Sequence, residues 1–267
     1  MNLLKSALAG LALAFAGVSP ARTPAIETSL QQALDRGNLL YAYDRAAWNG
    51  TDDLRAKAKA IIGQVGGWIV DGPASAPELV FYDKSEADPQ ILYAARFRGT
   101  KLVSSRLLGP ADDRTLSAER KRLIAAKRVA VPALVRSKAS RCVDKSFNTV
   151  VLPPAAPADP VLVYFLTPQT QQNAFPFGGH YRVDVPASGE PAVRPFAKSC
   201  LAMAVPAGPA KPEAMVVSHL LDPVPTEIHV FSSLAAGLPV AVVTSDKRVW
   251  MVEGSRRVRL LKSNGRS

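Results

Sequence analysis

The chain has few of the residues on which most catalytic and metal sites depend. Its 267 residues include two cysteines and three histidines. It contains no G-x-S-x-G elbow, no H-E-x-x-H pair and no glycine-rich phosphate loop, which excludes those serine hydrolase, zinc protease and nucleotide-binding signatures. The acid pairs Asp52-Asp53 and Asp112-Asp113 fall at expected helix starts or turns, where capping accounts for them. We therefore predict no catalytic residue and no firmly bound cofactor.

Residues 1–21 have the pattern of a secretory signal peptide. Lys5 precedes an apolar run from Leu8 to Val18, and small residues follow. This run is shorter than the ~20 residues that a membrane-spanning helix needs. We expect cleavage after Ala21, with Ala16 as the competing site, and no cysteine follows that would carry a lipid anchor. The chain is then periplasmic or secreted, with no transmembrane segment after signal removal.

Export would place Cys142 and Cys200 in an oxidising compartment. We predict that they form a disulfide. On the chain-entropy model, closing a loop of this length stabilises the fold by roughly 4 kcal/mol. The alternative is a pair of buried free thiols.

The formal net charge is +11. Such a charge suggests nucleic acid as the partner of a cytosolic protein, but export favours an anionic envelope surface instead, and we predict no nucleic acid. Nine lysines and arginines lie from Arg120 to Lys145, with Asp144 the only acid after the first of them. The alternative is that residues 120–145 form the solvated face of a helix.

The N-terminal part predicts an α+β module over residues 26–138. Gly37 and Asn49-Gly50 are interpreted as breaks between helices. Branched and aromatic residues separated by turn signals predict an antiparallel meander after the second helix. The expected helices are 26–35, 51–64 and 117–130, and the expected strands are 68–70, 78–82, 91–98 and 101–108.

The C-terminal part predicts a mixed α/β unit over residues 139–262. The apolar run 161–166 is expected to be a central strand, followed by strands at 180–185, 193–196 and 215–221. A helix from Pro225 to Gly237 and a β-meander over 240–261 complete it. The predicted fold class is α+β: a helix-plus-antiparallel-meander module beside a mixed sheet with one helix and a C-terminal meander.

All three histidines, His180, His219 and His229, lie in the C-terminal half. Neutral imidazole is the commonest metal ligand, so these side chains are candidate zinc ligands, with Asp184 as another candidate for the third position. The alternative is structural: His180 within a strand, His219 at a strand end and His229 on an exposed helix face.

The same region resembles the JAB/MPN metalloprotease-like domains, whose motif is H-[ST]-H followed by S-x-x-D, a helix and a strand. The resemblance is carried by Ser218-His219, a turn, Pro225-Thr226-x-x-His229, a helix and Gly237-Leu238-Pro239-Val240. It implies a zinc ion held by two histidines and an aspartate, with an upstream glutamate that activates water. The family's two histidines, serine and aspartate correspond here to Val217, His219, Thr226 and His229. The spacing is one residue shorter and no glutamate can be assigned, which implies a degenerate member.

Three functional hypotheses follow. The leading one is a non-catalytic periplasmic binding or structural protein. The first alternative is a zinc-dependent hydrolase of peptide or cell-wall amide bonds that uses His219, His229 and a third ligand. The second alternative is a basic protein that binds the envelope surface through residues 120–145.

Overall fold

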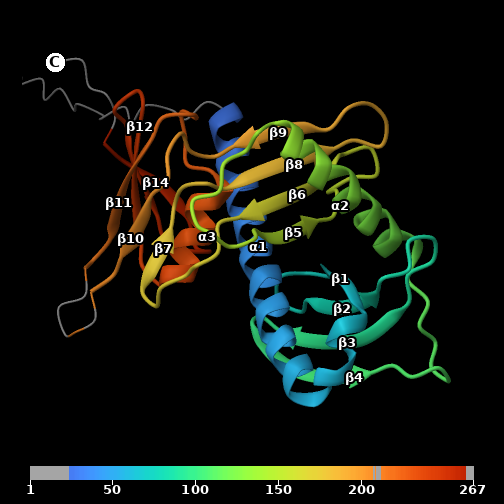
Figure 1. The fold of residues 1–267 in the computed structure, drawn as a ribbon. Coiled ribbons are helices and arrows are strands. Elements are labelled where there is room, and N and C mark those ends of the chain that lie inside the picture. Colours follow the sequence, from blue (N-terminus) through green and yellow to red (C-terminus); the bar gives the residue numbers. More distant parts are fainter. Residues whose placement is uncertain (1–23, 207, 209–211, 263–267) are drawn as a thin grey trace, which may run out of the picture.

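A computed structural model describes residues 24–206, 208 and 212–262, so the predicted signal peptide lies outside the described residues. This part of the chain forms three sheets of four strands, a two-stranded ribbon and three α-helices (Figure 1). The helices are α1 (Pro24–Lys57), α2 (Ala118–Arg136) and α3 (Glu227–Ala236). None of these helices is long and apolar enough to cross a membrane. The fold is α+β, as predicted.

The first sheet is the predicted antiparallel meander. Its strands follow one another in chain order, and they are β1 (Val65–Asp71), β2 (Glu78–Asp83), β3 (Ile91–Arg98) and β4 (Lys101–Leu107). The end of β3 alternates, with Phe97 buried and both Arg96 and Arg98 exposed. This is the pattern of an antiparallel strand with one solvated face.

The other two sheets come from the C-terminal half. The second is antiparallel in the order β5 (Asn148–Leu152), β6 (Val161–Leu166), β8 (Tyr181–Val185) and β9 (Ala192–Pro195). The third contains β11 (Met215–His219), β12 (Val240–Thr244), β13 (Val249–Val252) and β14 (Val258–Lys262). In it β11 and β12 are parallel and joined through α3, and the rest is an antiparallel meander. The ribbon pairs β7 (Ala174–Pro176) with β10 (Ala202–Ala204). The predicted central strand is β6, which is buried throughout.

The expected breaks in the first helix are wrong, because α1 continues through Gly37 and Gly50 for 34 residues. Both glycines are sites of close packing. A Cβ atom on Gly37 would lie 2.5 Å from Val230 Cβ on α3, and one on Gly50 would lie 2.1 Å from Leu79 Cδ2 on β2. Tertiary packing therefore keeps the helix intact where the sequence alone indicates turns.

Two other helix ends differ from expectation. The helix predicted to reach Gln64 stops at Lys57, and a 3-10 helix η1 (Lys59–Gln64) follows. In the other direction, α2 continues six residues beyond the predicted Ala130, past Pro132. Pro132 is exposed, so water can bind the backbone carbonyl that loses its helical donor.

The hydrophobic cores cross the expected boundary at residues 138 and 139. One core packs α1 against the first two sheets, joining Tyr93 to Tyr164, and a second packs α2 against their other faces, joining Leu123 to Val163. The third core fills the space between α3 and the third sheet and includes Leu30 of α1. The division into two modules remains a prediction, since the first two cores draw on both.

The predicted disulfide is confirmed. Cys142 and Cys200 are bonded, with Cα atoms 5.4 Å apart, and they join the segment before β5 to the segment before β10. Gly179 passes next to the bond, and a Cβ atom there would lie 2.3 Å from Cys142 Sγ. The disulfide is therefore packed against the turn that leads into β8.

Candidate functional site

His219 and His229 meet in the structure. His219 ends β11, His229 lies on the first turn of α3, and their ring centroids are 4.6 Å apart in an edge-to-face arrangement. His219 Nε2 lies 2.9 Å from Asp222 Oδ2, and the other oxygen of Asp222 accepts a hydrogen bond of 2.7 Å from Arg194. Burial raises the pKa of Asp222, but its bonds to His219 and Arg194 outweigh this and lower it. The ionised carboxylate thus accepts the Nε2–H of His219.

His229 is buried, which corrects the alternative that placed it on an exposed face. The helical face that it shares with Thr226, Ser232 and Ser233 is buried too. Its Nδ1 accepts the backbone N–H of Thr226 at 3.0 Å, which closes the first turn of α3. Burial, followed by the neighbouring His219, lowers the pKa of His229 to about 3. The ring is therefore a neutral helix-capping group.

His180 lies apart from this pair in its hydrogen bonding. Its Nδ1 accepts the backbone N–H of Thr167, and its Nε2 lies 3.1 Å from the Pro176 carbonyl oxygen. Burial lowers its pKa to about 4. Asp184 is occupied as well, since both of its oxygens bind Arg182. Among the described residues no three His, Cys, Asp or Glu side chains are grouped to hold a metal ion, so the predicted trio of ligands is not assembled there.

A buried polar network, which the sequence did not indicate, lies beside the histidines. Glu227 begins α3, and its carboxylate accepts hydrogen bonds from Arg182 at 2.7 Å and from the Tyr164 hydroxyl at 2.9 Å. Arg182 also binds Asp184 through a bidentate contact. Burial, with the Glu227 charge, raises the pKa of Tyr164 well above its usual value. The network ties α3 to β6 and β8 and leaves no open group for chemistry.

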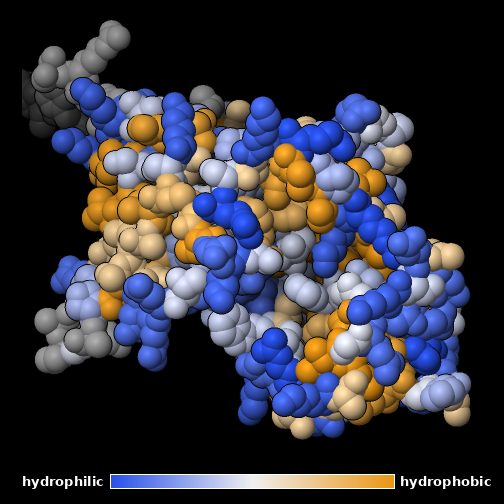
Figure 2. Space-filling model, in the orientation of Figure 1, coloured by the Kyte–Doolittle hydropathy of each residue, from blue (hydrophilic) through white to orange (hydrophobic). Residues whose placement is uncertain are grey.

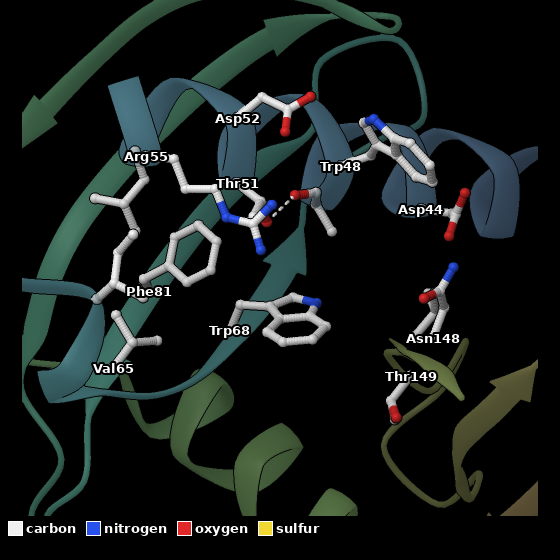
Figure 3. Close-up of a pocket in the computed structure, with 14 residues that line it drawn as sticks. Asp44, Trp48, Thr51, Asp52, Arg55, Val65, Trp68, Phe81, Asn148 and Thr149 are labelled. Atoms are coloured by element: carbon white, nitrogen blue, oxygen red, sulfur yellow. Dashed lines mark hydrogen bonds between the residues drawn. The ribbon is translucent and has the colours of Figure 1, made fainter. Parts of the chain in front are cut away.

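A larger cleft lies elsewhere, under the C-terminal half of α1. There β1 and β5, the edge strands of the first two sheets, lie side by side. A narrow gap lies between the two strands near Val70 and Val151, and a wider cleft lies near their first residues. The volume of this cleft is about 500 Å³, within the ~300–1,000 Å³ range of small-molecule pockets. Figure 3 shows it between α1, β1 and the start of β5.

Two tryptophans line this cleft, Trp48 from α1 and Trp68 from β1; we call them the cleft tryptophans. Trp48 is 46% exposed. The guanidinium of Arg45 lies 4.9 Å from the Trp48 ring, and the ammonium of Lys127 lies 4.4 Å from the Trp68 ring. Neither cation is among the residues that line the cleft. Each ring is thus held in place by a cation–π contact from outside the cleft.

Four polar residues, here named the cleft polar residues, project from α1 and β5: Asp52, Arg55, Asn148 and Thr149. No hydrogen bond or ion pair engages their side chains within the part of the chain that the structure describes. In Figure 3 the Arg55 side chain extends toward Trp68, while Asn148 and Thr149 lie on the side of β5. Donors and acceptors are therefore available to a ligand.

Asp44 also lines the cleft. This carboxylate is buried, and Arg45 Nη2 donates to it at 2.7 Å. Burial raises the pKa of Asp44, while Arg45 acts in the opposite direction. A smaller pocket of about 30 Å³ shares Asp44, Trp48 and Asn148 with the cleft and extends toward Phe231 of α3.

The cleft lining carries two carboxylates, Asp44 and Asp52, and the hydroxyls of Thr51 and Thr149. It includes no histidine, cysteine, serine or lysine, and the hydroxyl of Thr51 donates to the Ala47 carbonyl oxygen in its own helix. Comparison with known families, with curated proteins and with solved structures finds no match for this chain. The resemblance to JAB/MPN domains remains a prediction.

Proposed function

We propose that this chain is an exported, non-catalytic binding protein, periplasmic or secreted, whose ligand occupies the cleft under α1. The observation that carries the proposal is the contrast between the cleft and the interior. The cleft polar residues have no partner in the described fold, whereas the polar groups around Glu227 are bonded to one another. A bound ligand provides the hydrogen-bond partners that these side chains lack in the fold.

The proposal of export is supported by the pattern of residues 1–21 and by the disulfide, which suits an oxidising compartment. The test is to sequence the amino terminus of the protein recovered from the producing cells. Cleavage after Ala21 gives Arg22 as the first residue, and cleavage after Ala16 gives Gly17. An uncleaved amino terminus would contradict export by this route.

Ligand binding is tested with the three tryptophans as reporters, because two line the cleft and Trp250 lies in the third core. The 15N-labelled protein is titrated with an N-acetylglucosamine trisaccharide, adenosine, benzyltrimethylammonium and benzoate. We expect at least one probe to shift the indole N–H signals of Trp48 and Trp68 and to leave that of Trp250 unchanged.

A matched pair of variants locates the binding. Ala47 lines the cleft, and Ala56 is exposed on the same helix outside it. Ala47→Phe fills the cleft and should abolish the shifts, whereas Ala56→Phe should preserve them. If no probe shifts the signals, or if Ala47→Phe responds as the parent protein does, the proposed function is wrong.

The zinc hydrolase is less well supported. His219 and His229 offer two imidazoles, and Asp222 binds His219, but among the described residues no three such side chains are placed to hold a metal ion. Metal analysis of protein purified without chelator tests this alternative. Stoichiometric zinc that disappears in the His219→Ala, His229→Ala double variant would replace the binding proposal with the hydrolase.

A second candidate function, binding to an anionic envelope surface, is favoured by the end of α2. Five of the nine cations from Arg120 to Lys145 are engaged in the fold, and the four without a described partner are Arg136, Lys138, Arg141 and Lys145. Val129 and Val135 beside them are 44% and 72% exposed. Figure 2 shows an apolar patch bordered by hydrophilic residues over this half of α2.

Vesicle binding tests the second candidate. Vesicles that contain phosphatidylglycerol should retain the protein, and added salt should weaken the binding because the exposed charges are screened. Vesicles of phosphatidylcholine alone are the control. Binding that does not depend on lipid charge, or that persists in the Arg136→Gln, Lys138→Gln variant, would contradict this function.

A further inference from the structure

The cleft tryptophans offer large apolar surfaces that are already oriented. Arg45 holds the Trp48 ring and Lys127 holds the Trp68 ring, so little conformational freedom is lost when a ligand packs on either indole. Trp68 is further fixed by Phe81, whose ring centroid is 6.2 Å away. The part of the ligand that enters between these rings must have at least one flat, weakly polar face.

The cleft polar residues include both donors and acceptors, so a ligand that bonds to all of them must both donate and accept hydrogen bonds. The Asp52 carboxylate only accepts, the Arg55 guanidinium only donates, and the Asn148 amide and the Thr149 hydroxyl do both. These residues stand on two elements, α1 and β5, on different sides of the cleft. Hydroxyl groups arranged around the edge of a ring satisfy such a set, because each hydroxyl can donate and accept.

The cleft lining carries charges of both signs. Asp44 is paired with Arg45, and Asp52 stands one helical turn from Arg55 on α1. An anionic ligand would meet both carboxylates and a cationic ligand would meet the open guanidinium. A ligand with a net charge of either sign therefore meets a like charge in the lining, which favours an uncharged ligand.

We propose that the cleft binds an uncharged sugar ring, with its C–H face packed on a cleft tryptophan and its hydroxyl groups bonded to the cleft polar residues. The inference rests on the proposed function, because it names the ligand of the same cleft. A nucleoside base also has a flat face, but its hydrogen-bonding groups lie along fewer edges, so it serves as the comparison ligand.

The experiment extends the titration of indole signals to uncharged oligosaccharides built from glucose, galactose, mannose and N-acetylglucosamine. At least one should shift the signals of Trp48 and Trp68 and leave Trp250 unchanged. Trp48→Ala, at a 46% exposed position, should weaken that binding by about tenfold or more. Arg55→Gln should also weaken it by about tenfold. Lys59→Gln, an exposed change outside the cleft lining, should leave the affinity unchanged.

The outcomes separate the two proposals. If adenosine, benzyltrimethylammonium or benzoate shifts the cleft signals and no oligosaccharide does at millimolar concentration, the sugar inference is overturned and the binding function stands. If an oligosaccharide binds with the same affinity to the Trp48→Ala and Arg55→Gln variants, it binds elsewhere and the inference is also overturned. If no compound of any class shifts the signals, both proposals fall.

Discussion

Two polar regions of this molecule differ in how their polar groups are satisfied. Around α3, the side chains of Arg182, Glu227 and His229 are buried and bonded to partners in the fold. Around the C-terminal half of α1, Asp52 and Arg55 are exposed to the cleft and have no partner in the described chain. The first region therefore stabilises the fold, and the second is available for a ligand.

The comparison shows why residue type alone is a weak guide to a site. Histidines are common in metal and acid–base sites. Here His229 caps a helix, His180 binds backbone groups and His219 binds the Asp222 carboxylate. The polar groups that line the cleft belong to common residue types, and nothing in the sequence marks them as a site. The two regions differ in whether their polar groups have hydrogen-bond partners in the fold. Removing one group at a time tests this difference.

The largest effect is expected at Arg182. Arg182→Met removes the partner of Glu227 and Asp184 and leaves a buried carboxylate unpaired, so the free energy of unfolding should fall by about 3–5 kcal/mol. Urea denaturation measures the change. The cleft variant Arg55→Gln is the comparison and should stay within about 0.5 kcal/mol of the parent protein. Equal losses of unfolding free energy in both variants would contradict the proposed difference between the two regions.

The next largest effect is expected on acidification. The pKa values of His229 and His180 in the folded protein are about 3 and about 4, below the usual value of 6.5. Below pH 6.5 the unfolded chain therefore binds protons that the folded chain does not. Stability should be fully present above pH 6.5 and fall by about 1.4 kcal/mol per pH unit for each ring as the pH decreases toward 4.

Urea denaturation at several pH values between 7 and 4.5 measures this slope. His229→Gln should lower the slope of stability against pH by the contribution of one imidazole ring. The buried Asp44 contributes with the opposite sign, since its pKa is raised in the folded protein. A stability that is flat from pH 7 to pH 4.5 would contradict the buried, neutral state of the two histidines.

A smaller effect is expected where α1 passes between the two regions. Gly50→Ala places a methyl group against Leu79 and should destabilise the fold by about 1–3 kcal/mol. Gly63→Ala is the matched control, because nothing lies within 4 Å of a Cβ atom at that position. It should be neutral or stabilise the protein by up to about 1 kcal/mol. Thermal unfolding of the two variants decides whether close packing explains the continuous helix.

The smallest effect is expected at Lys127, next to the cleft. Burial lowers the pKa of this ammonium to about 8, and it lies 4.4 Å from the Trp68 ring. The Trp68 indole signal should therefore shift with a midpoint near pH 8 as the cation is lost. Lys127→Gln should remove the shift and cost about 0.5–2 kcal/mol. A Trp68 signal that does not change between pH 7 and pH 9 would contradict the cation–π contact.

Much of the fold was predictable because its signals are local. The β-strands of the first meander, the buried strand β6 and the order of strand, helix and meander at the C-terminus all follow from apolar patterns and turn residues. The disulfide followed from the cysteine count and the expected compartment. The first helix was not predictable. Gly37 and Gly50 carry the local signal of a turn, and only their contacts with Val230 and Leu79 reveal another role.

The candidate site was less predictable than the fold. The sequence drew attention to His180, His219 and His229, and the structure brings two of them together in a buried, bonded pair. The cleft depends on α1 crossing the edges of two sheets, one on each side of the expected module boundary. Nothing in the sequence sets Trp48 or Trp68 apart, and only the structure brings the two indoles to one cleft.

The sequence by itself determined most of the strands, the α+β class and the covalent link, because periodicity, turn chemistry and cysteine count act over short stretches or do not depend on geometry. It did not indicate β5, β7 or β10. The tertiary structure decided which polar groups have partners. A carboxylate or an imidazole looks the same in the sequence whether it is bonded in the interior or open to a ligand. That difference is set by neighbours that are distant in the chain, such as Arg182 for Glu227 and β5 for the cleft of α1.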